Sequence, residues 1–134
     1  MTSDSAETHR DMERSAFAEI LAHIDGVCPG FKAAVFYDRE GETIDYHSYL
    51  EPYDTRLAAA HIGVIVSSAI RRFELLALGK VEQIEIHSDR LDSVTVVMGD
   101  GLFLSVIVSA GHLSQLVYRK LIDVVREIRS EINI

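Results

Sequence analysis

The sequence has few of the residues that mark disulfide-stapled, membrane-spanning or nucleic-acid-binding proteins. Cys28 is the only cysteine, so an intramolecular disulfide is excluded and a reducing cytoplasm is expected. The longest apolar runs, such as Phe103–Ala110, fall far below the ~20 residues of a membrane span. The polar N-terminus lacks the apolar segment of a secretory signal. A net charge of −8 argues against binding to nucleic acid or to anionic membranes.

The composition is that of one globular domain. The chain has 134 residues, of which 48% are hydrophobic, enough for one sizeable core. Residues 1–12 are rich in Ser, Thr, Asp and Glu, and we expect them to form a disordered acidic tail. The folded domain is expected to cover residues 13–134.

The stretch from Asp54 to Gly79 organises the chain. Asp54 and Thr55 are suited to begin a helix, Pro52 is expected to block an earlier start, and Gly79 is suited to end it. The roughly 24 residues between would span ~36 Å. A broad apolar arc on this helix is formed by Ala58, Ile62, Ile65, Val66, Ala69, Ile70, Phe73 and Leu76.

A second apolar ridge on the same helix lies apart from the broad arc. It consists of Leu57, Val64 and Leu75. It is separated from the arc by His61, Ser68 and Arg72. One face of the helix can cover a sheet, so the second ridge needs another partner.

The other elements follow from hydrophobic periodicity and from turn residues. In the second predicted strand, Ile44 and Tyr46 alternate with Asp45 and His47, which is typical of an edge strand. The predicted elements are helices over Glu13–Ile24 and from Gly111–His112 onward, and strands over Phe31–Tyr37, Thr43–Tyr49, Val81–His87, Ser93–Met98 and Leu102–Val108.

This order predicts an α+β fold, an α/β sandwich with element order α-β-β-α-β-β-β-α. Strands 31–37 and 102–108 are apolar on both faces, so we place them inside a five-stranded antiparallel sheet. The two terminal helices are expected on one face and the long helix on the other. A second copy of the chain, related by a two-fold axis, would bury the second ridge.

Three segments resemble the roadblock family, which includes dynein light chains and bacterial MglB-like proteins. The most specific is Gly30–Ile44, an apolar strand that ends in Asp38-Arg39-Glu40-Gly41. The others are the alanine-rich start of the long helix, Leu57–Ala60, and the hairpin Gly99–Leu104. The resemblance covers about residues 17–131. The family's Leu-Gly-x-x-Arg-like pattern in the last helix is not matched, since Leu116–Arg119 lacks the glycine, so no function is transferred to that helix.

The resemblance implies a homodimer formed through the long helix and the neighbouring edge strand. It also implies binding to, or regulation of, a small Ras-like GTPase. The expected dimer interface consists of Leu57, His61, Val64, Ser68, Leu75, Ile84 and Ile86.

Two groups of residues are candidates for partner binding. Arg71 and Arg72 form the only adjacent arginine pair in the long helix; an arginine finger is one interpretation, and a solvated helix face is the favoured one. Tyr46, Tyr49 and Tyr53 are either interface anchors or side chains packed on the strand edge, and the sequence leaves both open.

Catalytic and metal-binding motifs are scarce. The histidines at positions 23, 47, 61, 87 and 112 fall on separate elements without a His-x-x-x-His pair. Cys28 lies in a Pro-Gly turn without an evident base, and no glycine-rich phosphate loop occurs. We therefore expect no cofactor, no metal and no enzymatic activity.

The sequence thus predicts a cytoplasmic, non-enzymatic, homodimeric regulator or scaffold that binds a small Ras-like GTPase. The alternative is a structural scaffold, or a motor or cargo adaptor subunit, without effect on nucleotide state. A small-ligand sensor domain of similar topology is a third hypothesis, without supporting pocket residues. Neither nucleic-acid binding nor membrane insertion is expected.

Overall fold

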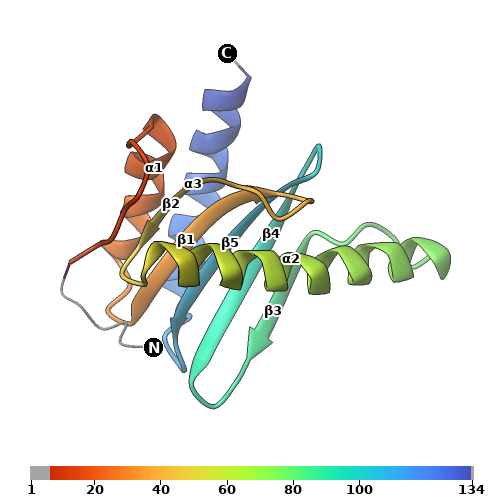
Figure 1. Cartoon of the computed structure of the whole chain (residues 1–134). Helices are drawn as coiled ribbons and strands as arrows, with labels where there is room; N and C mark the ends of the chain where they lie inside the picture. The colour runs from red at the N-terminus through yellow and green to blue at the C-terminus, as the bar shows by residue number, and fades with distance from the viewer. Residues whose placement is uncertain (1–6, 134) are drawn as a thin grey trace.

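The structure, a computed structural model, describes residues 7–133 as three helices and five strands (Figure 1). The predicted element order is confirmed. The elements are α1 (Ala16–Asp25), β1 (Phe31–Asp38), β2 (Thr43–Ser48), α2 (Pro52–Leu75), β3 (Gln83–His87), β4 (Leu91–Gly99), β5 (Leu102–Ser109) and α3 (Gln115–Ile132).

All neighbouring strands pair antiparallel, in the order β2-β1-β5-β4-β3. The two strands with apolar residues on both faces, β1 and β5, lie side by side inside the sheet, as predicted. Strand β2, predicted to be an edge strand from its alternation, and β3, the edge strand that the resemblance implies, form its two edges. Burial on both faces favours apolar side chains, whereas an edge tolerates polar ones.

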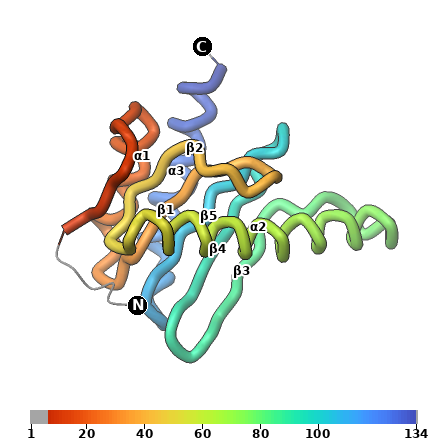
Figure 2. The backbone as a smooth tube through the Cα atoms, viewed as in Figure 1, coloured from red at the N-terminus to blue at the C-terminus, as the bar shows by residue number. Residues whose placement is uncertain are grey.

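The sheet separates two layers of helix. Helices α1 and α3 pack together on one face, and α2 crosses the other (Figures 1 and 2). The core on the α1/α3 side is the larger, with Leu21, Ile24, Phe36, Leu104 and Ile128 among its buried members. The predicted distribution of the helices is therefore confirmed.

Small residues bring α2 close to the sheet. Its buried residues are Thr55, Ala59, Gly63 and Val66. A Cβ atom added to Gly63 would lie 3.1 Å from Cε2 of Tyr37, so a larger residue would push the helix outward. The buried face is therefore not centred on the broad apolar arc.

Both ends of α2 differ from the prediction. The helix begins at Pro52, since proline fits the first helical turn, and Glu51 caps it without a side-chain hydrogen bond. The left-handed residue that ends it is Ala77 (φ 56°), and the N–H of Leu78 donates to the Phe73 carbonyl at 2.9 Å. The predicted start at Asp54 and the role of Gly79 as the terminating residue are wrong.

A bulge in β2 corrects the predicted alternation of that strand. The pairing with β1 shifts between Phe36 and Tyr37, which leaves Ile44 as an extra residue. Ile44 therefore packs on the α1/α3 side and Tyr46 on the α2 side. Asp45, predicted on the polar face, is fully buried.

The predicted disordered tail is wrong for residues 9–12. The N–H of His9 donates to the Ser48 carbonyl of β2 at 2.9 Å, and the following residues contact β2 and α2. The part of the tail at residues 1–6 lies outside the described residues.

Candidate interaction surface

Helix α2 is longer than the sheet that it crosses, and its C-terminal part extends past the β3 edge (Figure 1). Every residue from 71 to 80 is exposed. Within residues 7–133, eight of the eleven exposed large apolar side chains lie on α2 or just after it. These eight are Tyr53, Leu57, Val64, Ile65, Phe73, Leu75, Leu76 and Leu78.

The residues predicted for a dimer interface fall on one side of this surface. Val64 and Leu75 are 69% and 79% exposed. Leu57 and His61 are also exposed, and Ser68 is half-buried. The structure therefore leaves the second ridge open, and it also leaves Ile65, Phe73 and Leu76 of the broad arc exposed.

The neighbouring sheet edge is open as well. Within the described chain, β3 pairs only with β4. Ile84 and Ile86 pair with residues of β4 and are half-buried; Ile84 packs with the α2-side core. A notch of about 380 Å³ separates β3 from α2, with Phe73 and Ala69 on one side and Val81 and Ile84 on the other.

Arg71 and Arg72 are both exposed near the C-terminal end of α2. The Nε of Arg72 donates to the Ser68 hydroxyl at 3.3 Å. A cation in the last turn also interacts favourably with the partial negative charge of the helix C-terminus. This environment fits a solvated helix face.

The three candidate tyrosines have different environments. Tyr46 is fully buried in the α2-side core, so it is not available as an interface anchor. The hydroxyl of Tyr49 donates to Asp25 at 2.6 Å, and Asp25 also contacts Nε2 of His47 at 2.8 Å. Tyr49 is half-buried, and Tyr53, at 72% exposure, is the most accessible of the three to a partner.

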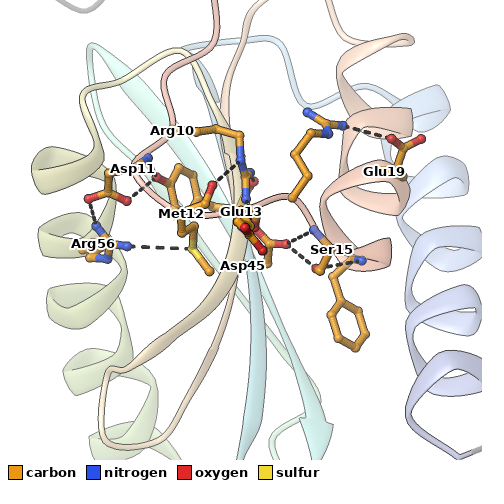
Figure 3. Close-up of polar contacts among 11 residues, drawn as sticks. Arg10, Asp11, Met12, Glu13, Ser15, Glu19, Asp45 and Arg56 are labelled. Carbon is orange, nitrogen blue, oxygen red and sulfur yellow. Dashed lines mark hydrogen bonds and ion pairs between the residues drawn. The ribbon is translucent and has the colours of Figure 1, made fainter.

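A segment that the sequence did not suggest joins the two helix layers at the β2 edge. We call residues His9–Ser15 the N-terminal strap (Figure 3). Its Arg10 donates to Oδ1 of the buried Asp45 at 2.7 Å and to the Tyr46 carbonyl at 2.6 Å. At the far end of the strap, the backbone N–H and the hydroxyl of Ser15 both donate to the Asp45 carboxylate. The Ser15 hydroxyl also accepts from the backbone N–H of Phe17, and this hydrogen bond caps the N-terminus of α1.

The strap also reaches α2. Asp11 accepts a hydrogen bond from the Tyr46 hydroxyl at 2.8 Å and forms an ion pair with Arg56 (Figure 3). The hydrogen bond from Arg56, followed by that from Tyr46, lowers the pKa of Asp11 to about 2. Burial on its own raises the pKa of Asp45, but the hydrogen bonds from Ser15 and Arg10 outweigh it, so that the pKa is lowered.

A second polar cluster joins β3 to the loop before α3. His87 contacts Glu85 at 3.0 Å through Nε2 and Asp92 at 3.1 Å through Nδ1. Asp92 also accepts from the N–H of Gly111 at 2.9 Å. The hydrogen bonds to Glu85 and then to Asp92 raise the pKa of His87, which favours the doubly protonated ring.

Groups for catalysis or metal binding do not converge in residues 7–133. No set of three or more His, Cys, Asp or Glu side chains in that range is placed to hold a metal ion. Cys28 is buried, and burial raises the pKa of its thiol, which makes it a poor nucleophile. No helix in the described part of the chain is long and apolar enough to cross a membrane.

The sequence did not predict the N-terminal strap, because the residues that it contacts lie far from it along the chain. Arg10 and Asp45 are 35 positions apart; Arg10 lies in a polar stretch, and the alternation of residues 44–47 groups Asp45 with the polar His47. The nearest sequence signal is Ser15, which is suited to begin a helix; the prediction placed that start at Glu13 instead.

The two helix layers, the strand order and the connections define the roadblock fold. No family model and no curated protein matches the chain. Solved structures do. The roadblock/LC7 domain from Streptomyces avermitilis has a TM-score of 0.81 at 17% identity, covering 90% of this chain and 100% of that one. MglB of Myxococcus xanthus has a TM-score of 0.79 at 14% identity, over 91% and 98% of the two chains.

A third similar structure is an MglB with a tetrameric arrangement, with a TM-score of 0.71 and 13% identity. It covers 85% of this chain and 88% of that one. At these identities the likeness establishes the roadblock fold, which confirms the fold suggested by the sequence resemblance.

Proposed function

We propose that this protein is a cytoplasmic, non-enzymatic homodimer that binds a small Ras-like GTPase and regulates its nucleotide state. The observation that carries the proposal is the apolar surface of α2 beside the open β3 edge. Contiguous exposed apolar surface of this kind is typical of protein–protein interfaces. The roadblock fold, shared with MglB, supports the choice of partner.

Association of two copies through α2 would bury part of this apolar surface. Burying ~600 Å² of apolar surface would contribute ~15 kcal/mol before costs, at ~25 cal/mol per Å². Ordering of side chains and lost translational freedom cancel much of that, but a stable dimer remains feasible. A second copy would cover α2 and could extend the sheet at β3, which removes an edge prone to aggregation.

Val64→Glu tests the dimer. A charge placed without a partner in a dry interface costs several kcal/mol, so we expect this variant to be monomeric by light scattering at micromolar concentration. Ile122→Glu is the matched control, because Ile122 is 59% exposed on α3, on the opposite face of the sheet. A wild-type monomer, or a Val64→Glu variant that stays dimeric, would contradict the proposed interface.

GTPase binding is tested by pull-down from a native lysate, followed by reconstitution with the purified GTPase. We expect complex formation and a change in the rate of GTP hydrolysis. A complex with an unchanged rate would support a structural scaffold or an adaptor subunit instead. Failure of every Ras-like GTPase of the organism to bind would contradict the GTPase proposal and leave the dimer intact.

Arg71→Ala and Arg72→Ala, singly and together, test how regulation works. We propose that the protein positions loops of the GTPase, an effect that can lower a barrier by ~7–11 kcal/mol in favourable cases. An inserted arginine finger is worth ~10³–10⁵ in rate. We expect a loss below about tenfold in stimulated hydrolysis when binding is matched; a loss near a thousandfold would identify a finger.

A further inference from the structure

A groove lies between α3 and the strand edge at β3, on the sheet face opposite α2. It arises because α1 and α3 pack together over one part of this face and leave its β3 side uncovered. The groove has a volume of about 760 Å³, within the ~300–1,000 Å³ range typical of binding pockets. Most of its lining residues lie on the face opposite the proposed dimer surface of α2; Glu82 and Gln83 also line the notch beside β3.

The middle of the groove is apolar. Leu121 and Val125 of α3 are buried beneath it, and Val96 of β4 is half-buried. Ile122 lies on the α3 side of the groove with 59% of its surface exposed, next to the buried Leu121 and one helix turn before the buried Val125. An exposed isoleucine above an apolar floor is suited to hold an apolar side chain of a partner.

One end of the groove is positively charged. Arg126 and Arg129 line it from α3, and Glu82 is the one carboxylate among the residues that line it. Arg126 has only a long contact of 3.9 Å to the exposed Asp123, which contributes little. Arg129 donates one hydrogen bond, to the Met98 carbonyl at 3.2 Å, and this fixes its guanidinium at the wall. In a chain with net charge −8, this end is a local basic site.

Tyr118, which lines the groove from α3, lies near the polar cluster of Glu85, His87 and Asp92. Burial, followed by its hydrogen bond to Glu85, raises the pKa of Tyr118 to about 12, so its hydroxyl stays neutral and engaged. Glu85 in turn contacts His87 at 3.0 Å. The groove is thus positive beside Arg126 and Arg129 and neutral at Tyr118, which gives a bound segment a preferred direction.

We propose that this groove docks a short segment of a partner protein that carries an apolar residue next to aspartate or glutamate. The apolar side chain would pack against Ile122 and Val96, and the carboxylate would pair with Arg126 and Arg129. Guanidinium groups bind carboxylates with two parallel hydrogen bonds, which selects acidic over neutral segments. The anions of a membrane surface are disfavoured, because Asp123, Glu127 and Glu131 alternate with the arginines along α3.

A library of 12-residue peptides displayed on phage provides the probe. We expect selection on the wild-type protein to enrich peptides with an Asp or Glu beside Leu, Ile, Met or Phe. Binding of these peptides should weaken at least about tenfold with Ile122→Glu, the scale of ~1.4 kcal/mol expected for a central contact. Arg119→Gln is the matched control, because it also makes the chain more negative by one unit, at an exposed position of α3 that does not line the groove.

Charge reversal at both arginines, Arg126→Glu with Arg129→Glu, gives the sharpest test. The wild-type peptides should lose binding, and a new selection on this variant should enrich Lys or Arg in place of Asp and Glu. Circular dichroism and thermal melting confirm that each variant is folded. Peptides that bind all variants equally, or the absence of enriched peptides, would overturn the proposal.

Vesicle binding tests the alternative that Arg126 and Arg129 bind an anionic membrane surface rather than a protein segment. Binding of the wild-type protein to phosphatidylserine vesicles that is lost on the same charge reversal would assign the arginines to a lipid surface and overturn the proposal. The peptide assay does not depend on a GTPase or on the dimer. Val64→Glu should therefore bind the peptides as the wild type does, whichever way the proposed function is decided.

Discussion

Removal of Arg10 should destabilise the domain far more than a change in a polar N-terminal segment usually does. Arg10 is the cation for Asp45, whose side chain is fully buried, and it also donates to the carbonyls of Met12, Glu13 and Tyr46. Arg10→Ala leaves a carboxylate in the interior without its counterion. Breaking a buried ion pair from one side typically costs ~3–5 kcal/mol.

Two features reduce that cost. The side chain of Arg10 retains 15% of its exposure, so water can approach the site once the guanidinium is gone. Asp45 also keeps hydrogen bonds from Ser15 and from the backbone N–H of Tyr46. We therefore expect Arg10→Ala to lower the free energy of unfolding by about 2–4 kcal/mol at pH 7.

The loss of stability caused by Arg10→Ala should be larger at neutral pH than at acidic pH. The pKa of Asp45 is lowered in the folded protein, so its contribution is present above the unfolded value of ~3.9 and is lost as the pH falls through the folded pKa. Without Arg10, burial favours the protonated acid. The difference in stability between wild type and Arg10→Ala should therefore be largest above pH ~5 and shrink at lower pH.

Urea unfolding at equal protein concentration measures this difference, since dimerisation would make stability depend on concentration. Arg14→Ala is the matched control, because Arg14 forms only an exposed contact of 3.5 Å with Glu19 and should change stability by at most ~1 kcal/mol. An Arg10→Ala protein within ~0.5 kcal/mol of wild type at pH 7 would refute the structural role of the strap.

Three further outcomes can be checked on the purified protein. His87→Gln should be less stable than wild type at acidic pH, and the gap should close as the pH rises above ~6.5 through the raised pKa of His87, measured by urea midpoints. Gly63→Leu should lower stability by ~1–3 kcal/mol or more in thermal melts, because it forces α2 away from Tyr37. Cys28 should react with a thiol reagent only when the protein unfolds, since it is buried and its thiol pKa is raised.

The sheet could be predicted because its signals are local. Residues 33–36 are apolar at successive positions, as are residues 102–108 except Ser105, which favours strands covered on both faces. The loop before β2 carries Gly41, whose φ of 85° is the conformation that the turn requires. Each signal lies within a few residues of the element that it specifies, so the order of elements and the strand positions follow.

The register of β2 could not be predicted in the same way. One extra residue, Ile44, reverses the faces of the strand on either side of it, and nothing in the local pattern marks a bulge at that point. The buried Asp45 is acceptable only because Arg10 reaches it from a segment of polar composition. The bulge, the buried acid and the strap are one feature, and each of them is unexpected without the other two.

The surface of α2 shows where sequence reasoning was sufficient and where it was not. Periodicity correctly indicated that this helix has more apolar surface than the sheet can cover, since Val64 and Leu75 are exposed. It did not indicate how much of the helix length lies on the sheet. Ala59, Gly63 and Val66 lie against the sheet, whereas residues 71–75 extend past the β3 edge, with Phe73 exposed beside the notch. A partner copy would therefore meet the overhang and the open strand together, and substitutions at Phe73 should weaken the dimer as those at Val64 do.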